Sequence, residues 1–261
     1  MFESLGFTLT QLELWLLVFV RFFTLLAVLP IFSYNTIDAR YRAIFAVVLA
    51  TLMVKLIPYP AENFPVEFTM LMFYVAREAL VGLCIGMFCG FLAEIIKFGG
   101  LQVSHMMGLN MSNVVDPTTS ENVEVLPQMF YTIAILLILA VDGHHFFLRA
   151  MFDTLFIIPI TAVNFSQDIV PQMIDLASNI VQLGIRVGAP AMIIIFLVRI
   201  VVGILNRLVQ DADIFAVILI VNVFIGLYIL MYYWPYFAQM TNMIYNITQS
   251  KVLTIIQLLG T

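Results

Sequence analysis

The chain has 261 residues, of which 63% are apolar and only 10% are charged. A soluble globular domain carries about 25% charged residues and is about half apolar, so this chain cannot cover its surface with polar side chains. The composition argues against a water-soluble enzyme and against a disordered protein. A formal charge of −5, from 11 basic and 16 acidic residues, argues against a nucleic-acid partner. The sequence therefore predicts a membrane protein.

The N-terminal segment is acidic and has no Lys or Arg before Arg21. A removable signal peptide starts with a basic region and ends at a small-residue cleavage site, and neither feature is present. The first apolar segment, at about 14–32, is therefore expected to stay in the mature protein. Pro30 and the polar stretch 33–36 should end it.

The hydropathy pattern predicts seven helical segments. They lie at about 14–32, 43–57, 69–98, 125–141, 146–163, 176–206 and 214–234. A helix needs about 20 residues to span a bilayer, and few of these segments fit, because some fall short and two exceed that length. Pro190 is expected to kink the 176–206 segment. The expected fold is all-α, with long kinked helices and a hairpin formed by the last two segments.

The two cysteines, Cys84 and Cys89, lie five residues apart in an apolar run. On a helix this spacing corresponds to about 140° of rotation, so the two thiols do not share a face. They are expected to be buried core thiols, and neither a disulfide nor a metal site is predicted from them.

Several ionisable residues fall inside the apolar segments, where a charge costs about 2.5–3.5 kcal/mol on insertion scales. They are Arg21, Arg77, Glu78, Glu94, Arg186 and Arg199. One interpretation is an ion-coupled transporter, and the other is a subunit with charges paired across helix or subunit contacts. Arginine does not deprotonate in proteins, which favours the second interpretation. Glu94 can also pair with Lys97 one turn later.

A row of small residues, Gly82, Gly86 and Gly90, lies on one face of the 69–98 helix. Such a row lets another helix approach closely. The partner helix belongs either to this chain or to a neighbouring subunit, and the sequence leaves both open.

The polar break at Asp142, His144 and His145 contains metal-ligand residue types. Adjacent histidines point apart on a helix, and no further ligand follows at a suitable spacing, so a polar loop is predicted in place of a metal site. The sequence also has no P-loop, no Gly-x-Ser-x-Gly and no His-Glu-x-x-His motif. Neither a catalytic site nor a cofactor is predicted.

The stretch 99–124 is long, rich in Gly, Asn and Met, and still apolar. Irregular backbone at membrane depth must be buried in protein or line a cavity. Methionine is flexible and makes adaptable apolar seals. The stretch is therefore either a plug that closes a pore or a surface loop with methionines facing lipid headgroups.

The run from Val103 to Ile160 resembles the middle of the FliR/SctT family of flagellar and injectisome export-gate proteins. The similarity rests on Met107-Gly108-Leu109, Asp116-Pro117, Gly143-His144 and the Asp153 to Pro159 run. Arg21, Pro30 and the Arg40-x-Arg42 pattern precede it, and Arg186 to Pro190 and Gly203 to Arg207 follow it. The chain departs from the family at Leu101, at Met106 and at residues 210–213, so the plug should be more apolar than usual.

The resemblance implies a FliP-like part at 1–165, containing a plug loop at about 99–124, followed by a FliQ-like hairpin and C-terminal tail at 166–261. It implies a helical hetero-oligomer with FliP-like and FliQ-like subunits, FlhB-like and FlhA-like partners, and unfolded exported protein as cargo. The gate would lie in the bacterial inner membrane, within the flagellar basal body and raised on the periplasmic side. By position, the plug would contain Met106, Met107, Gly108, Leu109, Asn110, Met111, Val114, Asp116 and Pro117.

Two rival functions remain from the residues alone. An ion-coupled secondary transporter of a small solute would use Arg77, Glu78 and Glu94 as its coupling site. An intramembrane enzyme would use Asp142, His144 and His145. A transporter should be stable alone, whereas a gate subunit should co-purify with small helical partners.

Overall fold

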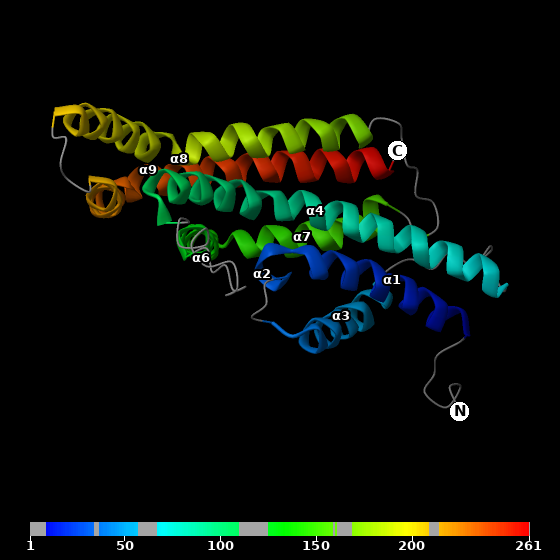
Figure 1. The fold of residues 1–261 in the computed structure, drawn as a ribbon. Coiled ribbons are helices and arrows are strands. Elements are labelled where there is room, and N and C mark those ends of the chain that lie inside the picture. Colours follow the sequence, from blue (N-terminus) through cyan, green and yellow to red (C-terminus); the bar gives the residue numbers. More distant parts are fainter. Residues whose placement is uncertain are drawn as a thin grey trace. The chain divides into compact units, whose positions relative to one another are not determined.

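The computed structural model describes residues 9–33, 37–56, 67–109, 125–158, 160, 169–208 and 214–260 (Figure 1). In these ranges the regular elements are helices, and no strand occurs, which confirms the predicted all-α fold. The helices are α1 (Leu9–Val28), α2 (Pro30–Ser33), α3 (Ala39–Val54), α4 (Phe68–Met107), α6 (Val125–Ala140), α7 (Gly143–Ile157), α8 (Ile169–Leu208) and α9 (Ile214–Gly260).

Four of these helices are long and apolar enough to cross a membrane. The candidate spans are Gln11–Val28, Phe68–Met107, Val170–Ile204 and Ile220–Gly260, and α6 with α7 would add a fifth if the two form one broken span. The composition-based prediction of a membrane protein agrees with these helices.

The chain divides into two compact units. Unit 1 contains Met1–Phe91, Asp142–Ile174 and Ile247–Thr261, and unit 2 contains Leu92–Val141 and Asp175–Asn246. The long helices α4, α8 and α9 therefore contribute to both units. This division differs from the predicted boundary at 165/166, and the FliP-like and FliQ-like parts remain a prediction.

Unit 1 is built around α1, whose buried side chains recur at helical spacing. Leu14, Leu17, Val18, Phe22 and Leu25 are all at most 1% exposed, which places them on one stripe of the helix. The opposite side of α1 packs on α3, and Figure 1 shows the two helices side by side.

Two polar contacts support the packing of α3 on α1. Trp15 Nε1 donates to the Thr51 hydroxyl at 3.0 Å, and Arg42 Nη1 donates to the Ala27 carbonyl at 3.3 Å. The Asp38 carboxylate accepts from the Arg40 amide, which caps the start of α3.

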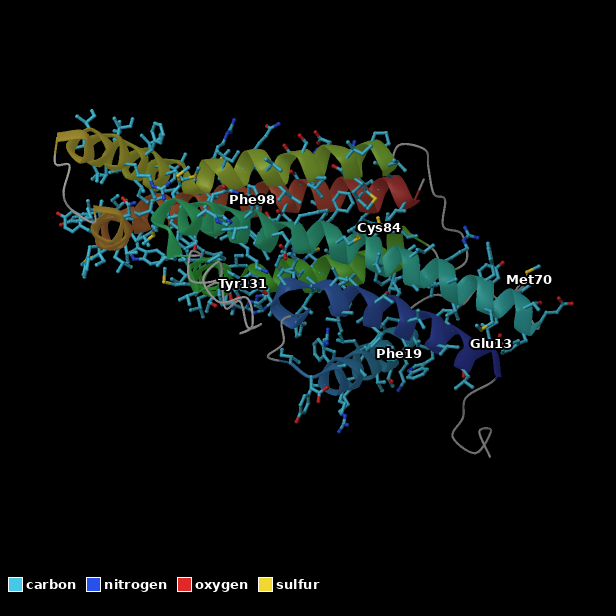
Figure 2. All side chains as sticks on the ribbon, in the orientation of Figure 1. Glu13, Phe19, Met70, Cys84, Phe98 and Tyr131 are labelled. Atoms are coloured by element: carbon cyan, nitrogen blue, oxygen red, sulfur yellow. The ribbon has the colours of Figure 1, made fainter. Side chains whose placement is uncertain are left out.

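Unit 2 packs α6 against α9 through aromatic rings. Phe130 lies 5.0 Å from Phe237 and 6.0 Å from Tyr233, measured between ring centroids. All three side chains are buried, and Figure 2 labels Tyr131, the residue that follows Phe130 on α6. Buried aromatic rings therefore contribute to the core of the unit.

The predicted end of the third segment at residue 98 is wrong, because α4 continues to Met107. The sequence predicts irregular backbone from Gly99 onward, but Gly99 and Gly100 are both helical. A Cβ at Gly99 would lie 2.8 Å from the Gly184 carbonyl oxygen of α8, and one at Gly100 would lie 3.0 Å from Pro127 Cα of α6. Close helix packing therefore uses these glycines and outweighs their low helix propensity.

The predicted end of the last segment at residue 234 is also wrong, because α9 runs from Ile214 to Gly260. Pro235 lies inside the helix, and Figure 1 shows that α9 changes direction along its length. Buried side chains continue beyond this proline at helical spacing, including Phe237, Ile244 and Val252. An amphipathic face, rather than uninterrupted hydropathy, sustains this part of the helix.

Candidate functional site

Arg21 lies at the centre of a buried polar cluster in unit 1. Its Nε donates to Glu78 Oε2 at 2.5 Å, and the two side chains are 0% and 1% exposed. Its Nη1 donates to the carbonyl oxygens of Thr154 and Ile158 at 2.9 and 3.0 Å. One arginine thus joins α1, α4 and the end of α7.

The carbonyls that Arg21 binds lie at the C-terminal end of α7. The Thr154 carbonyl also accepts from the Ile158 amide at 3.0 Å, whereas Ile158 is the C-cap residue, beyond which the helix supplies no further donor. A cation at a helix C-terminus also complements the helix dipole. The planar guanidinium can serve the carboxylate and both carbonyls at once, which a lysine ammonium on its flexible stem does less well. The arrangement is structural, because three buried partners hold the Arg21 guanidinium in place.

The glycine row predicted on α4 faces α1 within unit 1. A Cβ at Gly82 would clash with the backbone carbonyl of Arg21, and one at Gly86 would lie 3.0 Å from the Leu25 carbonyl oxygen. Gly90 is looser, because its nearest atom, the Val28 carbonyl oxygen, is 3.4 Å away. Of the two partners that the sequence left open, the structure places a helix of the same chain against this row. The close approach also brings Glu78 to Arg21.

The remaining predicted charges lie in different surroundings. Arg77 is partly buried, and its guanidinium carbon is 5.7 Å from the centre of the Phe73 ring. Glu94, Arg186 and Arg199 are exposed in this chain, so their predicted burial does not occur within the chain itself. In the described part of α4, Glu94 and Lys97 form no ion pair with each other. The predicted contacts of Glu94, Arg186 and Arg199 with other subunits stay predictions.

The first predicted plug residues belong to the end of α4. Met106 and Met107 are helical, and Gly108 ends the helix with a left-handed φ of 79°. Met107 is fully buried against Gly226 of α9, whereas Leu109 is 37% exposed. The predicted plug residues Asn110, Met111, Val114, Asp116 and Pro117 lie outside the described residues.

Asp142 precedes α7, and His144 and His145 lie in the first turn of that helix, so the predicted polar loop does not extend over the two histidines. Their ring centroids are 4.1 Å apart, so the prediction that the two imidazoles point apart is wrong. The backbone at Asp142 is left-handed, with a φ of 56°. One ligand atom from each of the three residues lies within 4.8 Å of the others. Among the described residues this is the one group that could hold a metal.

The absence of a metal site stays a prediction that elemental analysis can check. Because the cluster offers only three ligands, two of them on exposed residues, and a structural zinc site takes four protein ligands, we expect no stoichiometric metal in the purified protein. The measurement is metal content after purification without chelators. One bound ion per chain that is lost in a His144→Ala variant would contradict this expectation.

Sequence reasoning missed a second set of close-packed glycines, in unit 2. A Cβ at Gly188 of α8 would lie 3.0 Å from the Gly99 carbonyl oxygen, and one at Gly184 would lie 2.6 Å from Phe98 Cδ1. The spacing of Gly184 and Gly188 is the same four-residue spacing as in the α4 row and could have revealed them. By contrast, no residue-type signal could identify the carbonyls of Thr154 and Ile158 as partners of Arg21.

Comparison with known proteins gives one consistent result. Residues 12–247 match the family described as bacterial export proteins, family 1. The flagellar biosynthetic protein FliR of Bacillus subtilis (strain 168) is 26% identical over 248 residues, which cover 94% of this chain and 95% of that protein. FliR of Escherichia coli (strain K12) is 23% identical over 209 residues, covering 80% of this chain and 79% of that protein. FliR of Buchnera aphidicola subsp. Baizongia pistaciae is 25% identical, covering 90% and 91%.

Proposed function

Because this chain belongs to the family of bacterial export proteins, family 1, we propose that it is a non-enzymatic core subunit of the flagellar type III protein export gate. In this role it forms part of the channel wall, closes the channel with the segment after α4, and templates gate assembly. Its partners are FliP-like and FliQ-like subunits, with FlhB-like and FlhA-like proteins completing the machine. The cargo is unfolded flagellar subunits, and the gate is raised on the periplasmic side of the inner membrane.

The observation that carries this proposal is the exposed apolar surface of α8 and α9. In the 18-residue stretch of α8 that defines its candidate span, only 22% is buried within the chain. The corresponding share is 28% for α9 and 61% for α4. The candidate spans of 35 and 41 residues correspond to about 50 and 60 Å of helix at 1.5 Å per residue, against a hydrocarbon core of about 30 Å. Lipid covers only part of such a length, so other protein subunits must cover the rest.

The distribution of charges also favours a subunit of an assembly over a transporter. The coupling site of a transporter needs a carboxyl group that can exchange its proton or ion. Glu78 is instead held by Arg21 in a fully buried pair, and Arg77 lies over the Phe73 ring. Co-expression with FliP-like and FliQ-like proteins, followed by purification on a tag on this chain, tests the proposal. We expect a stoichiometric complex, and a stable, monodisperse chain without partners would contradict it.

Replacement of residues 110–122 by a Gly-Ser linker of the same length is expected to raise leakage of ions through the assembled gate. Gly and Ser cannot form the apolar seal proposed for this segment, to which Met111 and Val114 would contribute. The measurement is ion flux in vesicles containing the complex, at equal amounts of complex. Unchanged leakage at normal complex yield would contradict the assignment of this segment as the plug.

A further inference from the structure

The end of α4 is held by α8 and α9 within unit 2. Arg199 of α8 donates from Nη2 to the Met106 carbonyl oxygen at 2.6 Å. This carbonyl lies in the last turn of α4, where the helix supplies no donor, and the arginine also complements the helix dipole. Arg199 therefore acts as a side-chain cap delivered by another helix.

Met107 is held from the other side by a glycine of α9. A Cβ at Gly226 would lie 2.5 Å from Met107 Cε, 2.6 Å from Cγ and 2.7 Å from Sδ. The clash therefore involves the root of the side chain as well as its flexible end. Because Met107 is 0% exposed, it has no free space into which it can move.

The helix ends directly after these two contacts. Gly108 adopts a left-handed φ of 79°, and its amide donates to the His105 carbonyl oxygen at 3.1 Å. A left-handed glycine after the last helical residue is a common way to terminate a helix and redirect the chain. The point where the chain leaves α4 is thus fixed by a cap, a buried methionine and a terminating glycine.

We propose that Gly226 and Arg199 are positioning residues that set where the closing segment of the gate begins. The inference rests on the proposed function, in which the segment after Gly108 closes the channel. Gly226 admits Met107 because it has no side chain, and Arg199 holds the carbonyl of the residue before it. Loss of either contact is expected to free the end of α4, from which the proposed closing segment continues.

A double-substitution cycle tests the Gly226 contact in the complete gate complex. Gly226→Ala should displace Met107, whereas Met107→Ala removes the side chain that the new methyl group meets. The double variant Gly226→Ala with Met107→Ala should therefore recover much of the order at the end of α4 that Gly226→Ala alone loses. The effects of substitutions at two contacting residues are not additive. Gly203→Ala is the matched control, because no atom lies within 4 Å of a Cβ at that helical position.

The Arg199 contact has its own matched pair. Arg199→Met removes the cap on the Met106 carbonyl and keeps an apolar stem of similar length. Arg186→Met removes another exposed arginine from the same helix, where the Arg186 backbone carbonyl, and not its side chain, accepts from Tyr236. We expect an effect of Arg199→Met on the end of α4 and none of Arg186→Met.

Two measurements are made on each variant: hydrogen exchange of the amides at the end of α4, and ion leakage through the closed gate. Overpacking by Gly226→Ala is expected to raise exchange at 104–108 by about tenfold and to raise leakage, with both effects reduced in the double variant. Unchanged hydrogen exchange in both Gly226→Ala and Arg199→Met would overturn the inference. It would also be overturned if exchange changed but leakage did not, provided that the linker replacement of 110–122 does raise leakage. If the linker replacement itself leaves the gate closed, the proposed closing segment fails, and the exchange result alone decides whether the two residues position α4.

Discussion

Replacement of Arg21 by methionine is expected to destabilise the protein by about 3–5 kcal/mol, because it breaks a buried ion pair and leaves the Glu78 carboxylate buried without its arginine. Glu78 would keep a carboxylate that is 1% exposed, and the carbonyls of Thr154 and Ile158 would lose the hydrogen bonds from the guanidinium. The measurement is thermal unfolding of the purified gate complex, together with the yield of that complex. Both should fall well below those of the unaltered protein.

Two further variants separate the charge from the packing. Arg21→Met combined with Glu78→Leu should recover much of the lost stability, since a buried ion pair can often be replaced by apolar side chains of similar volume. Lys55→Met serves as the control, because that side chain is exposed at the end of α3 and should change stability little. If Arg21→Met gave a normal yield but no export, the cluster would have a role in transport instead of structure.

The sequence predicts the helical class and most helix positions because hydropathy and stop signals are local. It places the α6–α7 break at Asp142 correctly, since the polar tetrad 142–145 interrupts two apolar runs. It misjudges residues 99–107 and 235–260, where glycine and proline lie inside helices that tertiary packing sustains. Propensity is a weak guide at such places, because close contact with neighbouring helices outweighs it.

The site shows the same division between local and non-local information. Arg21 and Glu78 stand out in the sequence as charges in apolar helices, but their pairing spans 57 positions and follows only from the packing of α4 on α1. The packing partner of Met107 lies on α9, where Gly226 is an isolated glycine without a pattern. A single glycine that allows close helix packing cannot be recognised from the sequence. Glycines at a regular four-residue spacing can be recognised, as at Gly82, Gly86 and Gly90.

That repeat gives a graded prediction for alanine at each of its three positions. A Cβ at Gly82 would clash with the rigid Arg21 carbonyl, one at Gly86 would lie 3.0 Å from the Leu25 carbonyl oxygen, and one at Gly90 would lie 3.4 Å from the Val28 carbonyl oxygen. Alanine in a helix interior is favoured over glycine by about 1 kcal/mol, while overpacking costs about 1–3 kcal/mol. We therefore expect Gly82→Ala to destabilise strongly, Gly86→Ala to destabilise less, and Gly90→Ala to be neutral or slightly stabilising.

Gly203→Ala provides the reference for this series, because no atom lies within 4 Å of its added Cβ and only the helix propensity changes. The measurement is the midpoint of thermal unfolding for the four variants in the same complex and detergent. Gly82→Ala has an additional cost, since a shift of α4 away from α1 also lengthens the Arg21–Glu78 hydrogen bond. Its effect should therefore shrink in the Arg21→Met, Glu78→Leu background, while that of Gly86→Ala should stay the same. Equal losses at Gly82 and Gly90 would show that the row does not set the distance between α1 and α4.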